Sequence, residues 1–327
     1  MRTTEMVHNL WLHRLAKLVA GATFILIVIG GLVTSTGSGL AVPDWPNTYG
    51  QFMFSFPLSK MVGGILYEHG HRMVASVVGF LMTILTIWIW LKEPRRWVKW
   101  FSLAGLLAVI AQGILGGITV LFLLPTLISV LHGTLAQGFF CITICLAMFT
   151  SQEWSCGREK VVDTSKPGIQ NLAILTTIVV FVQLILGAIM RHTGSGLAIP
   201  DFPLAFGKII PPIHTQAVAI HFLHRVGALM VTISVVWTAL QIVRHHKNQT
   251  KLLRPMFILV SALIVQIFLA GLTIWTRMAV IPTTAHVAVG AFILGASLFL
   301  ALRTHLLLQS GESKAAQDSL TEQLVTS

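Results

Sequence analysis

Four histidines lie within or at the ends of long apolar segments and form two pairs of similar spacing. His71 and His132 are 61 residues apart, and His224 and His286 are 62 residues apart. Neutral imidazole binds iron well, and two opposed imidazoles can fill both axial positions of a heme. The alternative is four buried histidines, each hydrogen-bonded to a carbonyl or a neighbouring side chain. Because the pairs match, we favour heme iron, and we disfavour zinc or copper because cysteine and carboxylate partners are missing from the repeat.

Arginine directly follows the first histidine of each pair, as Arg72 and Arg225. A positive charge inside a long apolar segment that crosses a membrane is costly unless it is paired or faces a polar cavity. A guanidinium can bind a carboxylate through two hydrogen bonds, so heme propionates are natural partners. The alternative is that both side chains snorkel to the outer surface.

One position breaks the match between the pairs. Glu68 stands three residues before His71, whereas His221 occupies the corresponding position before His224. Residues three apart share a helix face, so Glu68 should lie beside whatever His71 binds, and His221 beside the second site. Glu68 is a candidate catalytic group that relays protons or stabilises a cationic intermediate, or it is a structural partner of Arg72. Among the remaining histidines, His69 has no histidine counterpart, and His192 and His214 are expected at the surface.

The composition requires a membrane protein. Hydrophobic residues make up 55% of the 327 residues and charged residues 10%, and the mean hydropathy is +0.81. Soluble domains have about 25% charged residues, so that class is excluded. Apolar runs long enough to cross a bilayer predict an all-α membrane protein with eight transmembrane helices. The predicted spans are roughly 17–36, 68–91, 100–121, 127–150, 169–190, 217–243, 255–276 and 282–307.

The net charge of +11 comes mostly from Lys and Arg in alternate connections. They gather before the first span, between the second and third, in the central linker, and between the sixth and seventh. This asymmetry predicts cytoplasmic termini and outward loops at 37–67 and 191–216, and it argues against nucleic acid as a partner. Cys141 and Cys145 are expected to be small buried residues, and Cys156 falls in a polar loop, so no disulfide framework is indicated. A bacterial inner membrane is the simplest location.

An internal repeat organises the chain. The segment Thr36–Pro46 returns as Thr193–Pro203 at an offset of 157, and the histidines return at offsets of 153 and 154. Four spans in each half give both copies the same orientation, which is a parallel repeat of two four-helix bundles. We predict an N-terminal four-helix bundle at 1–150, a cytoplasmic linker at 151–168, a C-terminal four-helix bundle at 169–310 and a polar tail at 311–327. The Gly-rich outward loops should cover the histidine sites, with Asp44 and Asp201 turning the chain.

These motifs together resemble the heme A synthase family. The resemblance rests on Glu68-His-Gly-His71-Arg72, His221-Phe-Leu-His224-Arg225, the paired Thr-Gly-Ser-Gly-Leu-Ala loops, Leu131-His132-Gly133 and Ala285-His286. It covers about residues 15–305. Many bacterial members carry a cysteine pair in the first outer loop, whereas this chain has Val42-Pro43 and Thr48-Tyr49 there, so it resembles a cysteine-free subtype.

The resemblance implies oxidation of the C8 methyl of heme O to a formyl group, which gives heme A for terminal oxidases. It assigns the substrate heme to His71 and His132, a heme b cofactor to His224 and His286, and the family's essential glutamate to Glu68. Expected partners are heme O, heme A, membrane lipid, and heme O synthase or oxidase assembly factors; the sequence leaves homo-oligomerisation open.

Two other functions compete with this one. A diheme b-type electron carrier would not need the Glu68/His221 difference and should purify with two hemes of one type. A heme or solute transporter would suit a parallel repeat, but histidines at one outward depth provide no inward relay. We therefore expect the synthase.

Overall fold

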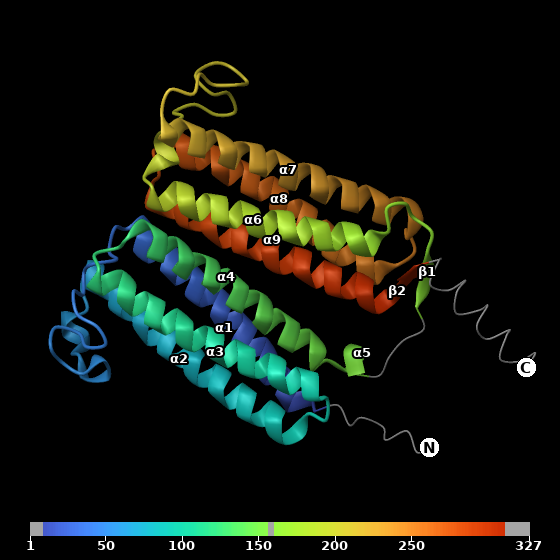
Figure 1. Ribbon diagram of the computed structural model, residues 1–327, viewed down its shortest axis with the longest axis horizontal. Helices are drawn as coiled ribbons and strands as arrows, with labels where there is room; N and C mark the ends of the chain where they lie inside the picture. The colour runs from blue at the N-terminus through green and yellow to red at the C-terminus, as the bar shows by residue number, and fades with distance from the viewer. Residues whose placement is uncertain (1–8, 156–159, 311–327) are drawn as a thin grey trace, which may run out of the picture.

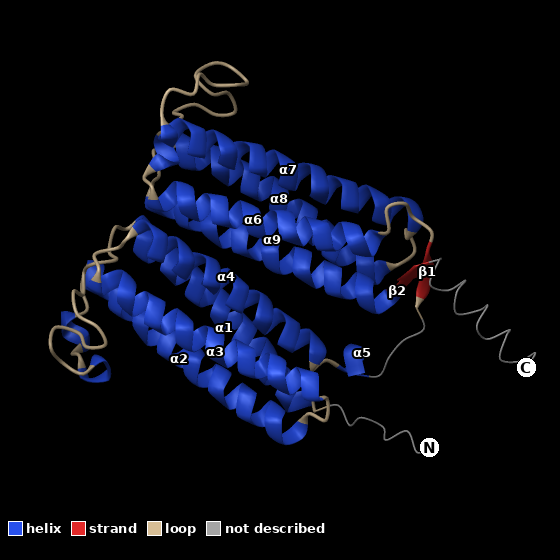
Figure 2. Ribbon diagram, viewed as in Figure 1, coloured by secondary structure: helices blue, strands red, loops and turns tan. Residues whose placement is uncertain are grey.

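The computed structural model describes residues 9–155 and 160–310 (Figure 1). In this part of the chain, eight helices are long and apolar enough to span a bilayer, which confirms the predicted all-α membrane fold (Figure 2). They are α1 (Leu10–Ser35), α2 (Gly64–Lys92), α3 (Arg96–Leu121), α4 (Thr126–Phe149), α6 (Ile169–His192), α7 (Gln216–His245), α8 (Thr250–Trp275) and α9 (Val280–Leu307).

The largest differences from the predicted spans are at two helix starts. Helix α1 begins at Leu10 because the Asn9 side chain accepts a hydrogen bond from the Leu12 amide at 3.1 Å and caps the helix. Arg14 and Lys17 are therefore part of α1, since a long cationic side chain can reach the interface from inside a helix. Helix α8 begins at Thr250 and includes Pro255, where the prediction started.

The long helices form two four-helix groups that lie side by side (Figure 1). In the first, α1 and α3 each pack against both α2 and α4, so α2 and α4 lie on a diagonal. In the second, α6 and α8 each pack against α7 and α9, which puts α7 and α9 on the equivalent diagonal. This packing is consistent with the predicted repeat. Cofactor sites in bundles are built between such facing helices.

The two groups meet along α1 and α4 on one side and α6 and α9 on the other. Phe24 of α1 contacts Phe140 of α4 and Phe292 of α9, with ring centroids 5.9 Å and 6.3 Å apart. Near the carboxyl ends of α1 and α6, the Arg191 guanidinium donates to the Ser35 hydroxyl at 3.2 Å. Apolar packing along the helices and a polar contact near their ends thus join the halves.

The connection between the halves is more structured than a plain linker. It contains the short helix α5 (Gln152–Ser155) and strand β1 (Val161–Asp163), which pairs in parallel with β2 (Leu308–Ser310) after α9. Burial raises the pKa of the Asp163 carboxyl, but hydrogen bonds from the Ser165 hydroxyl and from the Ile169 and Ser165 amides hold it below the usual value. Cys156 and the predicted tail at 311–327 lie outside the described residues.

Outside the bilayer-spanning helices, two loops stand at the same end of the molecule (Figure 1). The first connects α1 to α2 and contains the short helices η1 (Met53–Ser55) and η2 (Leu58–Lys60); the second connects α6 to α7 and contains η3 (Ser195–Leu197). These are the two predicted outward loops. They lie at the end opposite β1 and β2.

Candidate functional site

The four histidines lie at the loop end of the two bundles. His71, His132, His224 and His286 each occur in the second or third turn of a helix that starts at that end. His71 and His132 lie on α2 and α4, and His224 and His286 lie on α7 and α9. The structure thus places each predicted pair on the two helices of a bundle diagonal, at similar depth.

Glycines make room for three of these imidazole rings. A Cβ added at Gly30 would lie 3.1 Å from Cε1 of His71, and one at Gly187 would lie 3.1 Å from Cε1 of His224. Gly116 stands in the same relation to His132, also at 3.1 Å. A larger residue would push each ring out of place. Sequence reasoning missed these glycines, although Gly30 and Gly187 are separated by the same 157 residues as the loop motif.

Buried ring nitrogens without protein partners test whether a heme fits these sites. Within the described residues, the Nδ1 atoms of His71, His132 and His286 are buried and make no hydrogen bond. His224 Nδ1 lies 3.1 Å from Nε2 of Gln183. Buried polar atoms nearly always have a partner, so the unpaired nitrogens of these rings suit a ligand that binds imidazole. Together with the diagonal placement and the glycines, this fits a heme iron held by two imidazoles.

Glutamines from neighbouring helices contact three of the four histidines. Nε2 of Gln112 donates to the backbone oxygen of His132 at 3.0 Å, and Nε2 of Gln183 donates to that of His224 at 2.9 Å. Gln266 lies beside His286, with 3.5 Å between their Nε2 atoms. The position matching Gln183 in the first half is Leu26. His71 therefore lacks the equivalent polar neighbour, which is a second difference between the halves.

Glu68 and His221 occupy equivalent positions and bind equivalent loop amides. The Glu68 carboxylate is 4% exposed and accepts from the Val42 amide at 2.8 Å through Oε2. His221 accepts from the Ile199 amide at 3.2 Å through Nδ1. Glu68 also forms an ion pair with Arg72 at 2.5 Å. The structural interpretation of Glu68 is thus present in the fold, and a catalytic role would be additional to it.

The two arginines bind backbone oxygens of the loops. Arg72 donates to the carbonyls of Val42 and Asp44 at 2.8 Å and 2.7 Å. Arg225 donates to that of Asp201 at 2.6 Å and also to the loop at Leu204. Neither side chain simply extends to the surface. Contacts of Arg72, Arg225 and His221 with a propionate or a heme edge remain predictions, and a propionate would share each guanidinium with these carbonyls.

In each loop, the aspartate predicted to turn the chain accepts hydrogen bonds from two backbone amides. Asp44 accepts from the Tyr49 and Gly50 amides, both at 2.8 Å. Asp201 accepts from the Gly207 amide at 2.8 Å and the Phe206 amide at 2.7 Å, and these donors lower the pKa of Asp201 below its usual value.

An aromatic ring anchors each loop onto its bundle. The Trp45 ring lies against Gly117 of α3, and the Phe202 ring lies against Gly271 of α8. These contacts and the arginine bonds hold both loops at the histidine end. The two loops predicted to cover the histidine sites are therefore fixed to the bundles by these contacts.

The remaining histidines have structural surroundings. His69 is buried and its Nδ1 lies 3.1 Å from the Thr48 hydroxyl, so it helps to hold the first loop. His214 is exposed, as predicted, whereas His192 is half-buried. The free cysteines Cys141 and Cys145 are partly buried in α4.

Comparison with known proteins gives the family. The sequence pattern of the cytochrome oxidase assembly protein family matches residues 13–298. The chain belongs to this family. Among curated relatives, the heme A synthase of Alkalihalophilus pseudofirmus is 28% identical over 89% of this chain and 98% of its own length.

Two further heme A synthases show the same likeness. That of Symbiobacterium thermophilum is 30% identical over 69% of this chain and 75% of its own length. That of Shouchella clausii is 29% identical over 69% of this chain and 76% of its own length. The predicted resemblance to the heme A synthase family is confirmed.

Proposed function

We propose that this protein is a heme A synthase, which oxidises the C8 methyl of heme O to a formyl group and supplies heme A to terminal oxidases. The observation that carries this is one asymmetry in a duplicated site. Both halves place two histidines across a bundle diagonal, but only the first has a buried carboxylate three residues before its first histidine. Two identical electron-transfer sites would not need that difference.

In this proposal the first half holds the substrate and the second a resident cofactor. His71 and His132 bind the iron of heme O, and His224 and His286 bind that of heme b. Heme b, when bound, supplies one-electron transfer. The glycines opposite His71, His132 and His224 set the ring positions, Gln112 and Gln183 bond the backbone oxygens of His132 and His224, and Gln266 lies beside the His286 ring.

Glu68 is the group proposed to act in the reaction. Two imidazoles leave no open position on iron, so chemistry at the porphyrin edge suits a carboxylate on the same helix face as His71. Oε1 and Oε2 can hold a proton or stabilise positive charge beside the methyl being oxidised. The bonds from Arg72 and the Val42 amide fix the carboxylate orientation. The covering loop limits access of water.

The membrane setting follows from the charge distribution. We propose a multi-pass protein of a bacterial cell membrane with cytoplasmic termini and the two loops outward. The structure supports the parity, because α1 starts and α9 ends at the same end of the molecule (Figure 1). Apart from their propionates, substrate and product are hydrophobic and are expected to stay in the membrane, so delivery by heme O synthase and transfer to an oxidase assembly factor are the expected partnerships.

Pigment analysis of the purified protein tests the function. The protein is produced in cells that make heme O, its hemes are extracted, and they are separated by chromatography. We expect heme b together with heme O or heme A, and conversion of heme O to heme A in the producing cells. Two equivalents of heme b and no heme A would instead establish the diheme carrier.

A further inference from the structure

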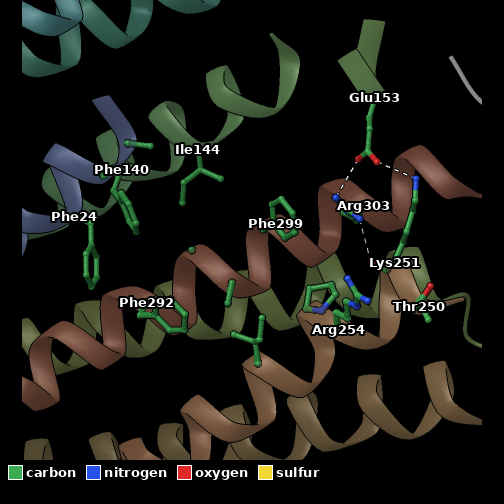
Figure 3. A pocket seen from close by; sticks show the side chains of 16 residues that line it. Phe24, Phe140, Ile144, Glu153, Thr250, Lys251, Arg254, Phe292, Phe299 and Arg303 are labelled. Carbon is green, nitrogen blue, oxygen red and sulfur yellow. Dashed lines mark hydrogen bonds and ion pairs between the residues drawn. The ribbon is translucent and has the colours of Figure 1, made fainter. Parts of the chain in front are cut away.

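A cavity of about 840 Å³ lies between the two bundles, away from the histidines. It is lined by residues of α1, α4, α8 and α9 and by Glu153 of α5 (Figure 3). Glu153, Thr250 and Arg303 place its polar side near the start of α8 and the end of α9, which is opposite to the Gly-rich loops. No lining residue is one of the predicted heme ligands.

The lining divides into an aromatic part and a cationic part. Phe24, Phe140, Phe292 and Phe299 lie along the apolar part in Figure 3. At the other end, Lys251 and Arg303 contact Glu153, the single acidic lining residue, and Arg254 is the third cation of the lining. The cavity is therefore amphipathic, with its charge at the end of the helices.

The positive charge exceeds what the carboxylate can neutralise. Glu153 accepts from Lys251 at 2.9 Å and forms an ion pair with Arg303 at 3.1 Å. Arg254 is exposed and makes no hydrogen bond or ion pair within the described residues. The Nε atom of Arg303 is buried and has no acceptor in the same part of the chain. An anionic group in the cavity would give Arg254 a partner, and the Arg303 guanidinium is also part of the lining.

We propose that this cavity binds an anionic phospholipid, with its phosphate on Arg254 and Arg303 and its acyl chains among the phenylalanines. Cationic pockets between transmembrane helices at a bilayer surface are suited to lipid phosphates, and guanidinium groups bind phosphate oxygens in pairs. The aromatic part favours a lipid over a free anion, because only a ligand with acyl chains gains binding free energy by burying them there. A lipid bound here joins α1 and α4 of the first half to α8 and α9 of the second.

Native mass spectrometry of the heme-loaded protein tests the proposal. The protein is delipidated in a non-ionic detergent and titrated with phosphatidylglycerol or, separately, with phosphatidylcholine. We expect one retained phosphatidylglycerol per chain at concentrations where phosphatidylcholine is not retained. Equal retention of both lipids, or of neither, would overturn the proposal.

Two matched pairs of variants locate the site. Arg254→Gln should raise the phosphatidylglycerol dissociation constant about fivefold, since one cation near a membrane surface contributes on that scale. Arg244→Gln, an exposed arginine of α7 outside the cavity, should leave it unchanged. Gly21→Leu should block the apolar part, because a Cβ at Gly21 meets nothing within 4 Å and the new side chain enters the cavity. Gly113→Leu, on an exposed face of α3, is its control.

The pattern of losses decides between ligands. Loss in both Arg254→Gln and Gly21→Leu, with neither control affected, identifies a lipid that spans the two parts of the cavity. Loss in Arg254→Gln alone, with displacement by millimolar inorganic phosphate, would show a free-anion site and reject the acyl-chain assignment. Loss in the controls as well would place the retained lipid elsewhere.

Discussion

The first and second bundles position their histidines by the same means but surround them with different chemistry. In both, a diagonal pair of helices supplies the imidazoles, and an arginine ties the covering loop to the first of these helices. Two differences concern the first histidine of each pair: Glu68 stands in place of His221, and Leu26 in place of Gln183. The arginines and aspartates that hold the loops are common to both halves.

The residues that the two halves share hold the sites together, and the residues that differ are the candidates for the reaction. Shared features, such as the loop amide bound by Glu68 in one half and by His221 in the other, belong to the framework. A buried carboxylate costs more than a buried neutral imidazole, so its presence in one half alone needs a compensating use. Without a glutamine behind it, His71 has fewer fixed contacts than His224. We therefore propose that the first half carries the chemistry.

The largest effect is expected from removing a ligand of the second pair. His286→Ala should abolish the low-spin signal of a heme held by two imidazoles in the second half, because one axial position is lost. Optical and electron paramagnetic resonance spectra of the purified protein measure it. His214→Ala, at an exposed loop position, is the control. If His286→Ala kept the low-spin signal intact, the pairing across α7 and α9 would be wrong.

Glu68→Gln should come next, with a fall of about a hundredfold or more in heme A formation. Glutamine keeps an acceptor for the Val42 amide, so the loop contact survives while the acid–base group is lost. Heme content should stay near that of the unsubstituted protein, and heme O should accumulate. Extracted hemes, quantified against total iron, measure both.

The outcome for Glu68→Gln also distinguishes the structural role from the catalytic one. If Glu68 serves only Arg72 and the loop, the variant should lower the melting temperature and leave the yield of heme A per bound heme unchanged. His221→Gln supplies the matching change in the second half, where it should affect the spectrum of heme b more than the product. Normal heme A yield in Glu68→Gln would remove the carboxylate from the mechanism.

A smaller effect is expected from exchanging the second difference. Gln183→Leu gives the second half the residue of the first and removes the donor to the His224 backbone oxygen. Loss of such a supporting contact typically weakens metal binding about tenfold or more, so heme b should dissociate about tenfold faster. The transfer rate to an excess of apomyoglobin measures this, and Gly113→Leu, on an exposed face of α3 in the other half, is the control. An unchanged rate would show that Gln183 does not hold the ligand.

Much of this arrangement could be predicted from the sequence, because the bilayer imposes simple constraints. A chain with such long apolar runs must form helices, and the constant offset of the histidines predicted which ones are equivalent. The helix starts were less accurate where a cap lies among charges, as at Asn9. Strand β1 could not be predicted, since its partner β2 is far away in the sequence and both are short.

The supporting shell of the site was harder to predict than its ligands. Gly30 and Gly187 are ordinary glycines in apolar helices until a neighbouring helix places an imidazole against them. The bonds from Arg72 to the loop were also missed, because backbone carbonyls carry no sequence signature; its contact with a propionate stays a prediction. The cavity between the bundles depends on how two folded halves meet, which no local pattern encodes.

The smallest effect concerns the loop turns. The Gly207 and Phe206 amides donate to Asp201 and lower its pKa below the usual 3.8, so these bonds are complete above that value and are lost as the pH falls through the folded pKa. Asp201→Asn should speed amide hydrogen exchange in the 201–208 segment by less than about fivefold at neutral pH, because the group is exposed and solvent screens it. Exchange followed by mass spectrometry measures the change.

Asp44→Asn provides the comparison in the first loop. There, burial raises the pKa of Asp44, and the hydrogen bonds from the Gly50 and Tyr49 amides outweigh it, so the pKa is lowered overall. A larger effect on heme A formation from Asp44→Asn than from Asp201→Asn would show that the first loop, beyond its turn, is part of the reacting half; equal effects would confine both aspartates to the framework.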